Sequence, residues 1–379
     1  MRAFCAPFAQ DALFAPRGLL LLAGLLALPA LAESEPGLGN PGTSAEISFR
    51  ATALLHAADE PAAASWEGAS AFDAMATIPW KRGSWTALLE TGRGAGYGEH
   101  LPTLSGLYDD ADDDPSIHVT EFYFDAPASE GRIGFEVGKL DLTARLESPA
   151  CGRWDGAGFH STGFVHSLAV AYPDPGPGGT LRVRPTGATT LSLGWASADA
   201  SWERPFSRPF VWAQLEFARA HARRPGTWVV HAWRNGSDHE RLDLPGTTTG
   251  AGWGAGVSGI QEVGGNAAFF LRAGLQREEI YAVGQSFSGG VMLSGTAFRR
   301  PHDEAGVAIG VARPGGPFAT AAHAAGRVPA DERHIEAYYR VNIGGGWSLS
   351  PHMHWITNPQ GERSGDDARV FGVLTSWEG

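Results

Sequence analysis

The sequence predicts an all-β fold, a transmembrane antiparallel up-and-down β-barrel of about 16 strands. Three observations predict it. Segments of about ten residues alternate apolar and polar side chains, as strands of such barrels do. The connections between them are alternately short and long. The composition combines 51 Gly, 13 Trp and 19 Phe with only 18% charged residues, which fits closely turned strands with aromatic girdles.

The N-terminus has the pattern of a secretory signal. Arg17 supplies positive charge, Gly18–Leu28 is an apolar core, and Ala30–Ala32 is a small-x-small cleavage site. We therefore expect residues 1–32 to be removed on export and residues 33–379 to form one barrel domain. No later segment has the ~18 consecutive apolar residues of a membrane-spanning helix, so a helical membrane protein is excluded.

The expected strands follow one another along the whole remaining chain without a domain linker. Each is bounded by a turn signal and most show a period of two. They are Thr43–His56, Ala69–Ile78, Ser84–Thr91, Ile117–Asp125, Arg132–Leu142, Gly179–Arg184, Thr189–Ala198, Phe210–Ala218, Gly226–Arg234, Gly252–Ile260, Asn266–Gln276, Ser288–Phe298, Ala305–Val311, Arg333–Ile343, Trp347–Thr357 and Arg369–Trp377.

The alternation is clearest near the C-terminus. Within Arg333–Ile343, apolar residues such as Ile335 and Val341 fall on one strand face, and polar residues such as Glu336 and Arg340 fall on the other. In a soluble sheet the polar face would meet bulk water. In an outer-membrane barrel the apolar face meets lipid and the polar face lines the lumen.

The connections differ sharply in length. Tight turns are expected at Pro127–Gly131 and Gly344–Gly346, and long polar loops at Gly92–Ser116, Thr143–Gly178, Pro314–Glu332 and Asn358–Asp367. Outer-membrane barrels have short turns on the periplasmic side and long loops outside. Residues 143–178 form the longest loop, and long loops in compact domains are usually functional. We expect this loop to fold inward and narrow the pore.

Motifs around that loop and at the C-terminus follow one another in a recognisable order. Gly138–Asp141 ends a strand as G-K-L-D, Phe159–Val165 reads F-x-x-T-x-F-V, and Pro173–Gly178 is a Pro/Gly turn before the Arg-bearing strand Leu181–Arg184. Near the end, Glu336–Arg340 reads E-x-Y-Y-R, and L-S-P-x-x-x-W-I-x-N-P follows from residue 349. In this order the motifs resemble the carbohydrate-selective porins, the OprB-like family.

The resemblance implies a 16-stranded outer-membrane barrel that admits sugars by diffusion. The chain departs from the family pattern in its short loops. It also departs after Asp141, where Arg145, Cys151 and Trp154 replace an Asn/Asp-rich run, and at its end, where Glu378-Gly379 follows an aromatic residue. The change after Asp141 bears on which sugar is selected.

The polar strand faces and the residues beside the expected inward loop give the candidate pore lining. Charged groups of both signs offer donors and acceptors that a sugar hydroxyl exchanges for water at little net cost. The alternative is that these charges pair with one another and merely solvate a wide lumen. The candidates are Arg50, Glu121, Glu136, Lys139, Asp141, Arg182, Arg184, Arg272, Glu336 and Arg340. Of these, Lys139, Asp141, Arg182 and Arg184 flank the expected inward loop and form the set favoured for function.

Other chemistry is not indicated. The acidic run Asp109–Asp114 lacks the spacing of a calcium loop. A plain solvated outer loop is expected, and an outer loop that shares divalent cations with lipopolysaccharide is the alternative. His352 and His354 share a strand face, but no third ligand is nearby in the sequence, so neither a metal site nor a cofactor is predicted. Neither a G-x-S-x-G elbow nor an H-E-x-x-H motif occurs.

The leading function is therefore an outer-membrane channel for passive diffusion of sugars or other small neutral solutes. The open alternatives are a general diffusion pore, a barrel enzyme and a secreted all-β glycan-binding protein. The expected partners are solutes, outer-membrane lipid and lipopolysaccharide, with a homo-oligomer left open. A net charge of -12 argues against a nucleic-acid partner.

Overall fold

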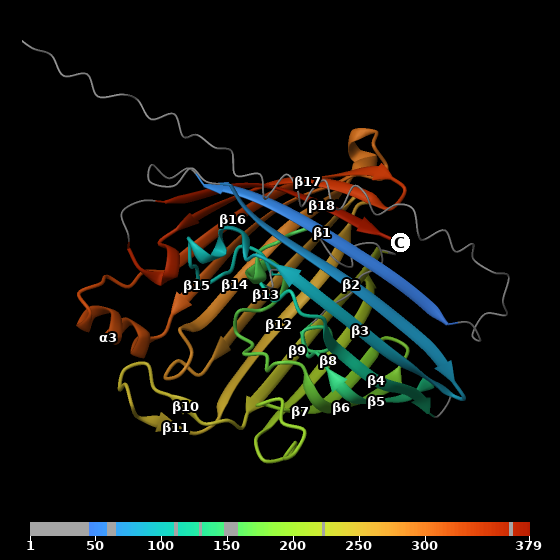
Figure 1. Ribbon diagram of the computed structural model, residues 1–379, viewed down its shortest axis with the longest axis horizontal. Helices are drawn as coiled ribbons and strands as arrows, with labels where there is room; N and C mark the ends of the chain where they lie inside the picture. The colour runs from blue at the N-terminus through green and yellow to red at the C-terminus, as the bar shows by residue number, and fades with distance from the viewer. Residues whose placement is uncertain are drawn as a thin grey trace, which may run out of the picture.

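Sixteen strands close into one antiparallel barrel in the computed structural model of the protein (Figure 1). The structure describes residues 45–58, 66–109, 113–128, 131–147, 158–221, 224–363 and 367–379. The predicted signal segment, residues 1–32, lies outside these ranges, as do Cys151 and Trp154. The predicted all-β transmembrane barrel of about 16 strands is confirmed.

Every expected strand has a counterpart in the barrel. The bounds are β1 (Glu46–Ala58), β2 (Trp66–Trp80), β3 (Gly83–Arg93), β4 (His118–Ala128), β5 (Ile133–Leu140), β6 (Gly176–Thr186), β7 (Thr189–Ser197), β8 (Pro209–His221), β9 (Arg224–Asn235), β12 (Gly252–Val263), β13 (Ala267–Gln276), β14 (Val283–Ser294), β15 (Glu304–Pro314), β16 (Glu332–Gly344), β17 (Trp347–Thr357) and β18 (Ala368–Glu378). The strands β10 (His239–Glu240) and β11 (Thr248–Thr249) pair with each other outside the barrel.

One strand differs clearly from its expected bounds. The segment expected as Ser288–Phe298 begins earlier, at Val283, and ends at Ser294. A 3-10 turn over Gly295–Phe298 then follows, and the Ser294 side chain accepts a hydrogen bond from the N–H of Thr296. This local side-chain bond competes with continued strand pairing, and the strand ends there.

The barrel closes where the first strand meets the last. β1 pairs antiparallel with β18, from Arg50 opposite Glu378 to Ala58 opposite Val370. Closure gives the backbone groups of both end strands a partner, which a membrane interior requires because it offers no water.

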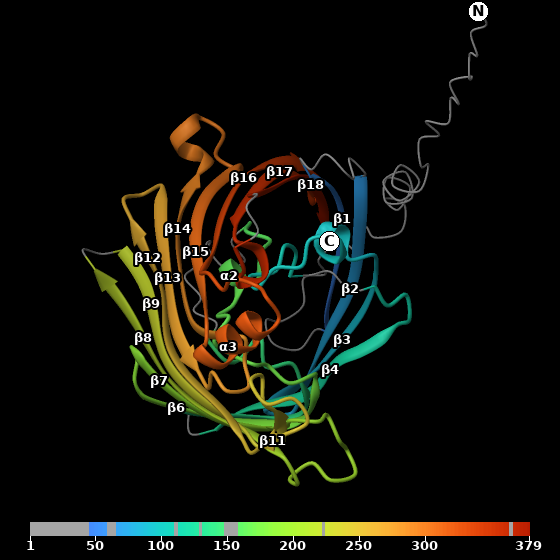
Figure 2. The ribbon, with the colours of Figure 1, turned by 90° about the vertical axis from the view of Figure 1, so that its left-hand side faces the viewer.

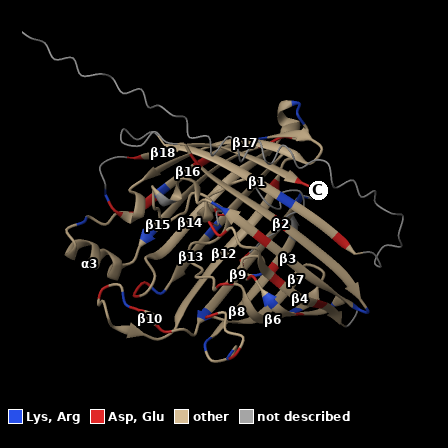
Figure 3. Cartoon of the chain, viewed as in Figure 1, with Lys and Arg blue, Asp and Glu red and all other residues tan. Residues whose placement is uncertain are grey.

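The outer face of the wall is apolar. Phe122, Val137 and Ile309 alternate with inward residues along their strands and are 51%, 51% and 56% exposed. In Figure 3 most residues of the strands are coloured as neither acidic nor basic. So much exposed apolar surface is stable against lipid rather than water. None of the helices in the described ranges is long and apolar enough to span a membrane.

The two ends of the barrel carry different connections. At one end the strands are joined by short stretches such as residues 81–82, 187–188 and 345–346. At the other end lie the described parts of residues 94–117 and 141–175, together with residues 236–251 and 315–331, the last of which contains α3 (Gly316–Ala324). Figure 1 shows α3 and the β10–β11 pair at this same end. This asymmetry is the one expected of an outer-membrane barrel.

Parts of the long connections lie inside the ring of strands. Figure 2 shows α2 (Thr162–Val165) within the barrel. Phe159 and Phe164 form a buried cluster with Phe270 of β13 and Tyr338 of β16. The described parts of residues 143–178 therefore cover the inner face of one side of the barrel.

A second buried cluster continues this cover toward β8 and β9. It combines Leu142 and Leu146 of the same connection with Trp212 and Trp233 of the wall. Burying these rings removes a large apolar area from water and fixes the connection in place.

Candidate pore constriction

A ladder of alternating charges links three neighbouring strands to the inward connection. Arg145 donates from Nε to Oε2 of Glu136 at 2.9 Å and from Nη1 to Glu121. Arg182 donates from Nη1 to Oε1 of Glu136 at 2.6 Å and from Nη2 to Asp125. Strand alternation explains the arrangement, because these four wall residues all face inward from β4, β5 and β6.

The guanidinium of Arg145 sits at the centre of this ladder. It lies 4.5 Å from the ring centroid of Tyr123 and also donates to the backbone oxygen of Asp141 at 2.7 Å. Burial lowers the pKa of Arg145, but the charges of Glu121 and Glu136 outweigh this effect and hold the pKa above its ordinary value. The site therefore keeps a permanent cation between two carboxylates.

Asp141 starts the connection that carries Arg145. Its Oδ1 accepts from the N–H of Thr143 at 2.9 Å, and its own N–H donates to Oε1 of Glu121 at 3.0 Å. Asp141 thus turns the chain from β5 into the lumen. A carboxylate that binds its own backbone two residues on is a common way to begin a turn.

Arg272 of β13 holds the same connection from the other side. Its Nε donates to Oε1 of Glu147 at 3.0 Å, and its Nη1 donates to the backbone oxygen of Phe164 at 2.6 Å. Oε2 of Glu147 in turn accepts from the N–H of Ser167 at 2.9 Å. The side chains of Arg272 and Glu147 are nearly or fully buried, so each stabilises a charge that the other would otherwise leave unpaired.

Glu336 of β16 fixes the part of the connection that precedes α2. Its two carboxylate oxygens accept from the N–H of His160 at 2.7 Å and from the N–H of Ser161 at 3.0 Å. Glu336 is fully buried. These two bonds satisfy backbone donors that the loop conformation removes from water.

Glu332 does the same for the connection between β3 and β4. Its carboxylate accepts from the N–H groups of Leu104 and Ser105, both at 2.8 Å, and from the N–H of Gln360 at 2.9 Å. It therefore ties two long connections to the wall at one point.

Two predicted cations pair with carboxylates on neighbouring strands of the wall. Arg50 of β1 donates from Nε to Oδ2 of Asp73 on β2 at 2.6 Å, and the two residues are direct register partners. Arg340 of β16 donates from Nη2 to Oε2 of Glu304 on β15 at 3.1 Å. Both pairs leave a guanidinium partly accessible.

Two members of the set favoured for function lie elsewhere. Lys139 follows Phe135 and Val137 on the outer face of β5, because it is three residues from the inward Glu136, and its Nζ donates to the backbone oxygen of Val119 at 2.5 Å. The prediction that Lys139 lines the pore is corrected accordingly: alternation places it on the outer face.

Arg184 lies at the end of the barrel with short connections. It is exposed, and its Nη1 lies 3.4 Å from the backbone oxygen of Gly131, in the turn between β4 and β5. The structure therefore brings Asp141 and Arg182 to the ladder but leaves Arg184 apart from it and Lys139 outside.

Several residues of the site were not among the sequence candidates. Glu332 precedes the expected strand by one residue and shares its face with Glu336, so alternation alone identifies it once the strand is extended. Asp125 likewise ended an expected strand. Arg145 and Glu147 lie in a loop without periodicity, and their partners are distant in sequence, so no local signal identifies them.

Comparisons with known proteins agree with this architecture. Residues 262–378, from the end of β12 through β18, match the family model described as Carbohydrate-selective porin, OprB family. A comparison with curated protein sequences finds no match.

Among solved structures, the high-pH structure of Pseudomonas putida OprB superposes with a TM-score of 0.76 at 12% identity, covering 89% of this chain and 94% of that one. The low-pH structure of the same protein gives a TM-score of 0.57 at 10% identity, covering 88% and 92%. OccAB4 of Acinetobacter baumannii gives a TM-score of 0.52 at 10% identity, covering 90% of this chain and 100% of that one. At these identities the likeness shows the fold.

The match over residues 262–378 and the 16-stranded porin barrel agree with the motifs at residues 138–184 and 336–359. The chain therefore has the fold of an outer-membrane porin barrel, and its C-terminal third, residues 262–378, is similar to the carbohydrate-selective porin, OprB family.

Proposed function

We propose that carbohydrates diffuse passively through this barrel along the wall formed by β1 to β6. One observation carries the proposal, the unequal exposure of inward-facing side chains. On β12 to β17, residues such as Met292 and Glu336 are fully buried beneath the inward connections. On the opposite wall, the side chains of Arg50, Arg182 and Asp125 keep 45%, 26% and 34% of their surface exposed. We therefore place the route on the β1 to β6 side, where these three charged side chains stay accessible; on the covered side Arg340, on β16, is also partly accessible.

The lining of this route suits neutral solutes. Two of its guanidinium groups are matched by carboxylates: Arg50 pairs with Asp73, and Arg182 pairs with Glu136 and Asp125. Paired charges present many hydrogen-bond donors and acceptors but a weak net field. A sugar exchanges its water hydrogen bonds for these groups at little net cost, whereas an ion finds no unbalanced counter-charge.

The inward connection sets the width of the route. Arg145 brings the connection against Glu121 and Glu136, and Arg272 and Glu336 hold it from the far wall. A segment fixed on two sides remains in place as solutes pass. The described parts of residues 143–178 thus act as a static constriction, and no cofactor or energy source takes part.

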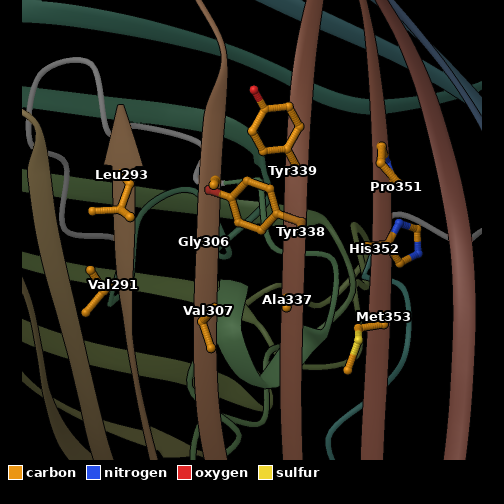
Figure 4. A pocket seen from close by; sticks show the side chains of 11 residues that line it. Val291, Leu293, Gly306, Val307, Ala337, Tyr338, Tyr339, Pro351, His352 and Met353 are labelled. Carbon is orange, nitrogen blue, oxygen red and sulfur yellow. The ribbon is translucent and has the colours of Figure 1, made fainter. Parts of the chain in front are cut away.

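The outer surface serves the membrane in this proposal. A groove of about 470 Å³ on the wall is lined by residues including Val307, Ala337 and Met353 (Figure 4). We assign it to acyl chains of outer-membrane lipid, with lipopolysaccharide around the long loops. The 1–32 segment acts as the export signal. A homo-oligomer packed through this face is the alternative, and chemical cross-linking in detergent tests it.

Liposome swelling with refolded protein tests the route. Wild-type protein should admit monosaccharides faster than amino acids or salts of similar size. Arg182→Ala should change the ranking among sugars, because it removes donors from the accessible wall. Lys139→Ala is the matched control, since Lys139 lies on the outer face, and it should leave the ranking unchanged. Equal rates that depend only on solute size would instead show a general diffusion pore.

A further inference from the structure

Three histidines from two strands converge inside the barrel, close to the seam where it closes. His56 of β1 and His352 and His354 of β17 place one ring nitrogen each within 4.8 Å of one another, and all three are buried. His56 and His352 both pair in register with Gly372 of β18, from opposite sides. Their rings meet over this glycine, with the two Nε2 atoms 2.8 Å apart.

Gly372 makes this approach possible. A Cβ at this position would overlap the rings of both His352 and His56. Glycine inside a strand usually weakens pairing, and it often marks a place where another group approaches the backbone closely. Here that group is a pair of imidazoles.

The surrounding hydrogen bonds decide which nitrogen of His352 carries a lone pair. Its Nδ1 lies 3.2 Å from the backbone oxygen of Ser350. A carbonyl oxygen only accepts, so Nδ1 carries the proton and Nε2 keeps its lone pair. This Nε2 is the atom that faces His56.

A chain of hydrogen bonds from Glu332 decides which ring nitrogen of His354 carries a lone pair. Ser105 donates from Oγ to Glu332 at 2.6 Å, so its Oγ accepts from Nδ1–H of His334 at 2.8 Å. Nε2 of His334 is then an acceptor and receives Nδ1–H of His354 at 3.0 Å. Nε2 of His354 is left with a lone pair, and it has no hydrogen-bond partner among the described residues.

His56 completes the set. Its Nδ1 is buried and also has no hydrogen-bond partner among the described residues. When the proton of His56 resides on this Nδ1, its Nε2 presents a third lone pair beside that of His352. Three neutral imidazoles, two of which (His352 and His354) have their other ring nitrogen held by a hydrogen bond, can bind Zn²⁺ and leave a fourth position for water.

We propose that His56, His352 and His354 bind one divalent late-transition-metal ion, with Zn²⁺ as the first candidate. Imidazole ligands suit Zn²⁺, Ni²⁺ and Cu²⁺ better than Ca²⁺ or Mg²⁺, which prefer oxygen. Zn–N bonds are ~2.0–2.1 Å long, so ligand nitrogens must lie slightly farther apart than a hydrogen bond. A small opening of the His56–His352 contact meets this requirement.

The position of the site gives it a structural role. The ion would join β1 to β17 across β18, so it would tie together both strands that form the closing seam. An ion that binds only the folded barrel stabilises it in proportion to the logarithm of its concentration over Kd. His56 and His352 are 296 positions apart in the chain, which is why the sequence showed only two ligands.

Refolding with and without metal tests the proposal. The full barrel is refolded in detergent with Zn²⁺ or with a chelator, freed of excess ion, and analysed for bound metal. We expect close to one Zn²⁺ per chain, and Co²⁺ in its place should give the intense visible absorption of a tetrahedral site. His354→Ala should lose most of the bound metal. His231→Ala is the matched control, because His231 is a buried histidine of β9 outside this cluster.

Two further measurements keep the result decisive. Gly372→Ala should reduce metal binding although it removes no ligand, because its methyl group displaces two of the rings. Heat-modifiability on gels shows whether each variant still folds, and Zn²⁺ should raise the unfolding temperature of the wild type but not of His354→Ala. Wild-type barrels without bound Zn²⁺, or equal metal content in wild type and His354→Ala, would overturn the proposal.

Discussion

The carboxylate of Glu336 accepts a hydrogen bond from the backbone N–H of His160 at 2.7 Å, deep inside the barrel. One of these residues belongs to the wall and the other to the connection that occupies the lumen. The contact therefore attaches the inward connection directly to the barrel wall. Oε2 of the same carboxylate also lies 3.8 Å from Nδ1 of His354 on β17.

Removing this attachment should loosen the constriction. Glu336→Ala leaves the N–H groups of His160 and Ser161 without acceptors, which costs about 1–3 kcal/mol for each buried group left unsatisfied. We expect a lower unfolding midpoint in urea and faster swelling with larger sugars. Glu336→Gln retains one acceptor oxygen, so its unfolding midpoint and its swelling rate should lie between those of wild type and Glu336→Ala. Unchanged sugar cut-off in Glu336→Ala would show that the connection is held without this residue.

Arg145 should control charge selectivity. Arg145→Ala leaves Glu121 and Glu136 with one cation fewer between them, and the constriction becomes more negative. Rings of carboxylates favour cations in pores. The reversal potential of reconstituted channels under a salt gradient should therefore shift toward cation selectivity. Lys139→Ala, on the outer face, removes the same charge without this shift, and an equal shift in both variants would refute the assignment.

The wall was predictable from the sequence and the lumen was not, and two residues illustrate the difference. Glu336 alternates with Ile335 and Ala337 along an expected strand, so its inward orientation follows from a period of two. Arg145 lies in a segment without period, and its partner Glu121 is 24 positions away on another strand. Pairing of this kind depends on how a loop packs in three dimensions. The prediction that Lys139 lines the pore rests on the G-K-L-D motif to which it belongs. Counting alternate residues from the inward Glu136 places it on the outer face instead.

A glycine beside the same ladder should be required for assembly. Gly138 has a φ of 151°, and a Cβ there would overlap the backbone oxygen of Phe122 on the paired strand. Gly138→Ala should destabilise the barrel by about 1–3 kcal/mol, the usual cost of a strained backbone position. Gly187→Ala is the control, because nothing lies within 4 Å of its added methyl group. Equal folded yields for both variants on heat-modifiability gels would contradict this expectation.

The turn between β14 and β15 should depend on pH through Asp303. The side chain of Arg300 donates to this carboxylate and lowers its pKa, and the O–H of Tyr339 supports it at 2.8 Å. A carboxyl group with a lowered folded-state pKa stabilises the protein above its unfolded pKa, and this contribution is lost as pH falls through the folded value. The unfolding midpoint of wild type should therefore begin to approach that of Asp303→Asn as pH falls below 3.8, the ordinary pKa, and the charge contribution should be gone below the lowered folded pKa. If the difference between the two unfolding midpoints stays the same in acid, the charge of Asp303 does not contribute to stability.

The central claim is that solutes pass along β1 to β6, and site-directed labelling tests it most directly. In a Cys151→Ser background, single cysteines replace Arg182 on the accessible wall or Met292 on the wall covered by the inward connection. A water-soluble thiol reagent is then added to reconstituted channels. The proposal predicts that labelling blocks sugar flux through the Arg182→Cys channel and leaves the Met292→Cys channel unaffected. Block of the second channel without block of the first would contradict it.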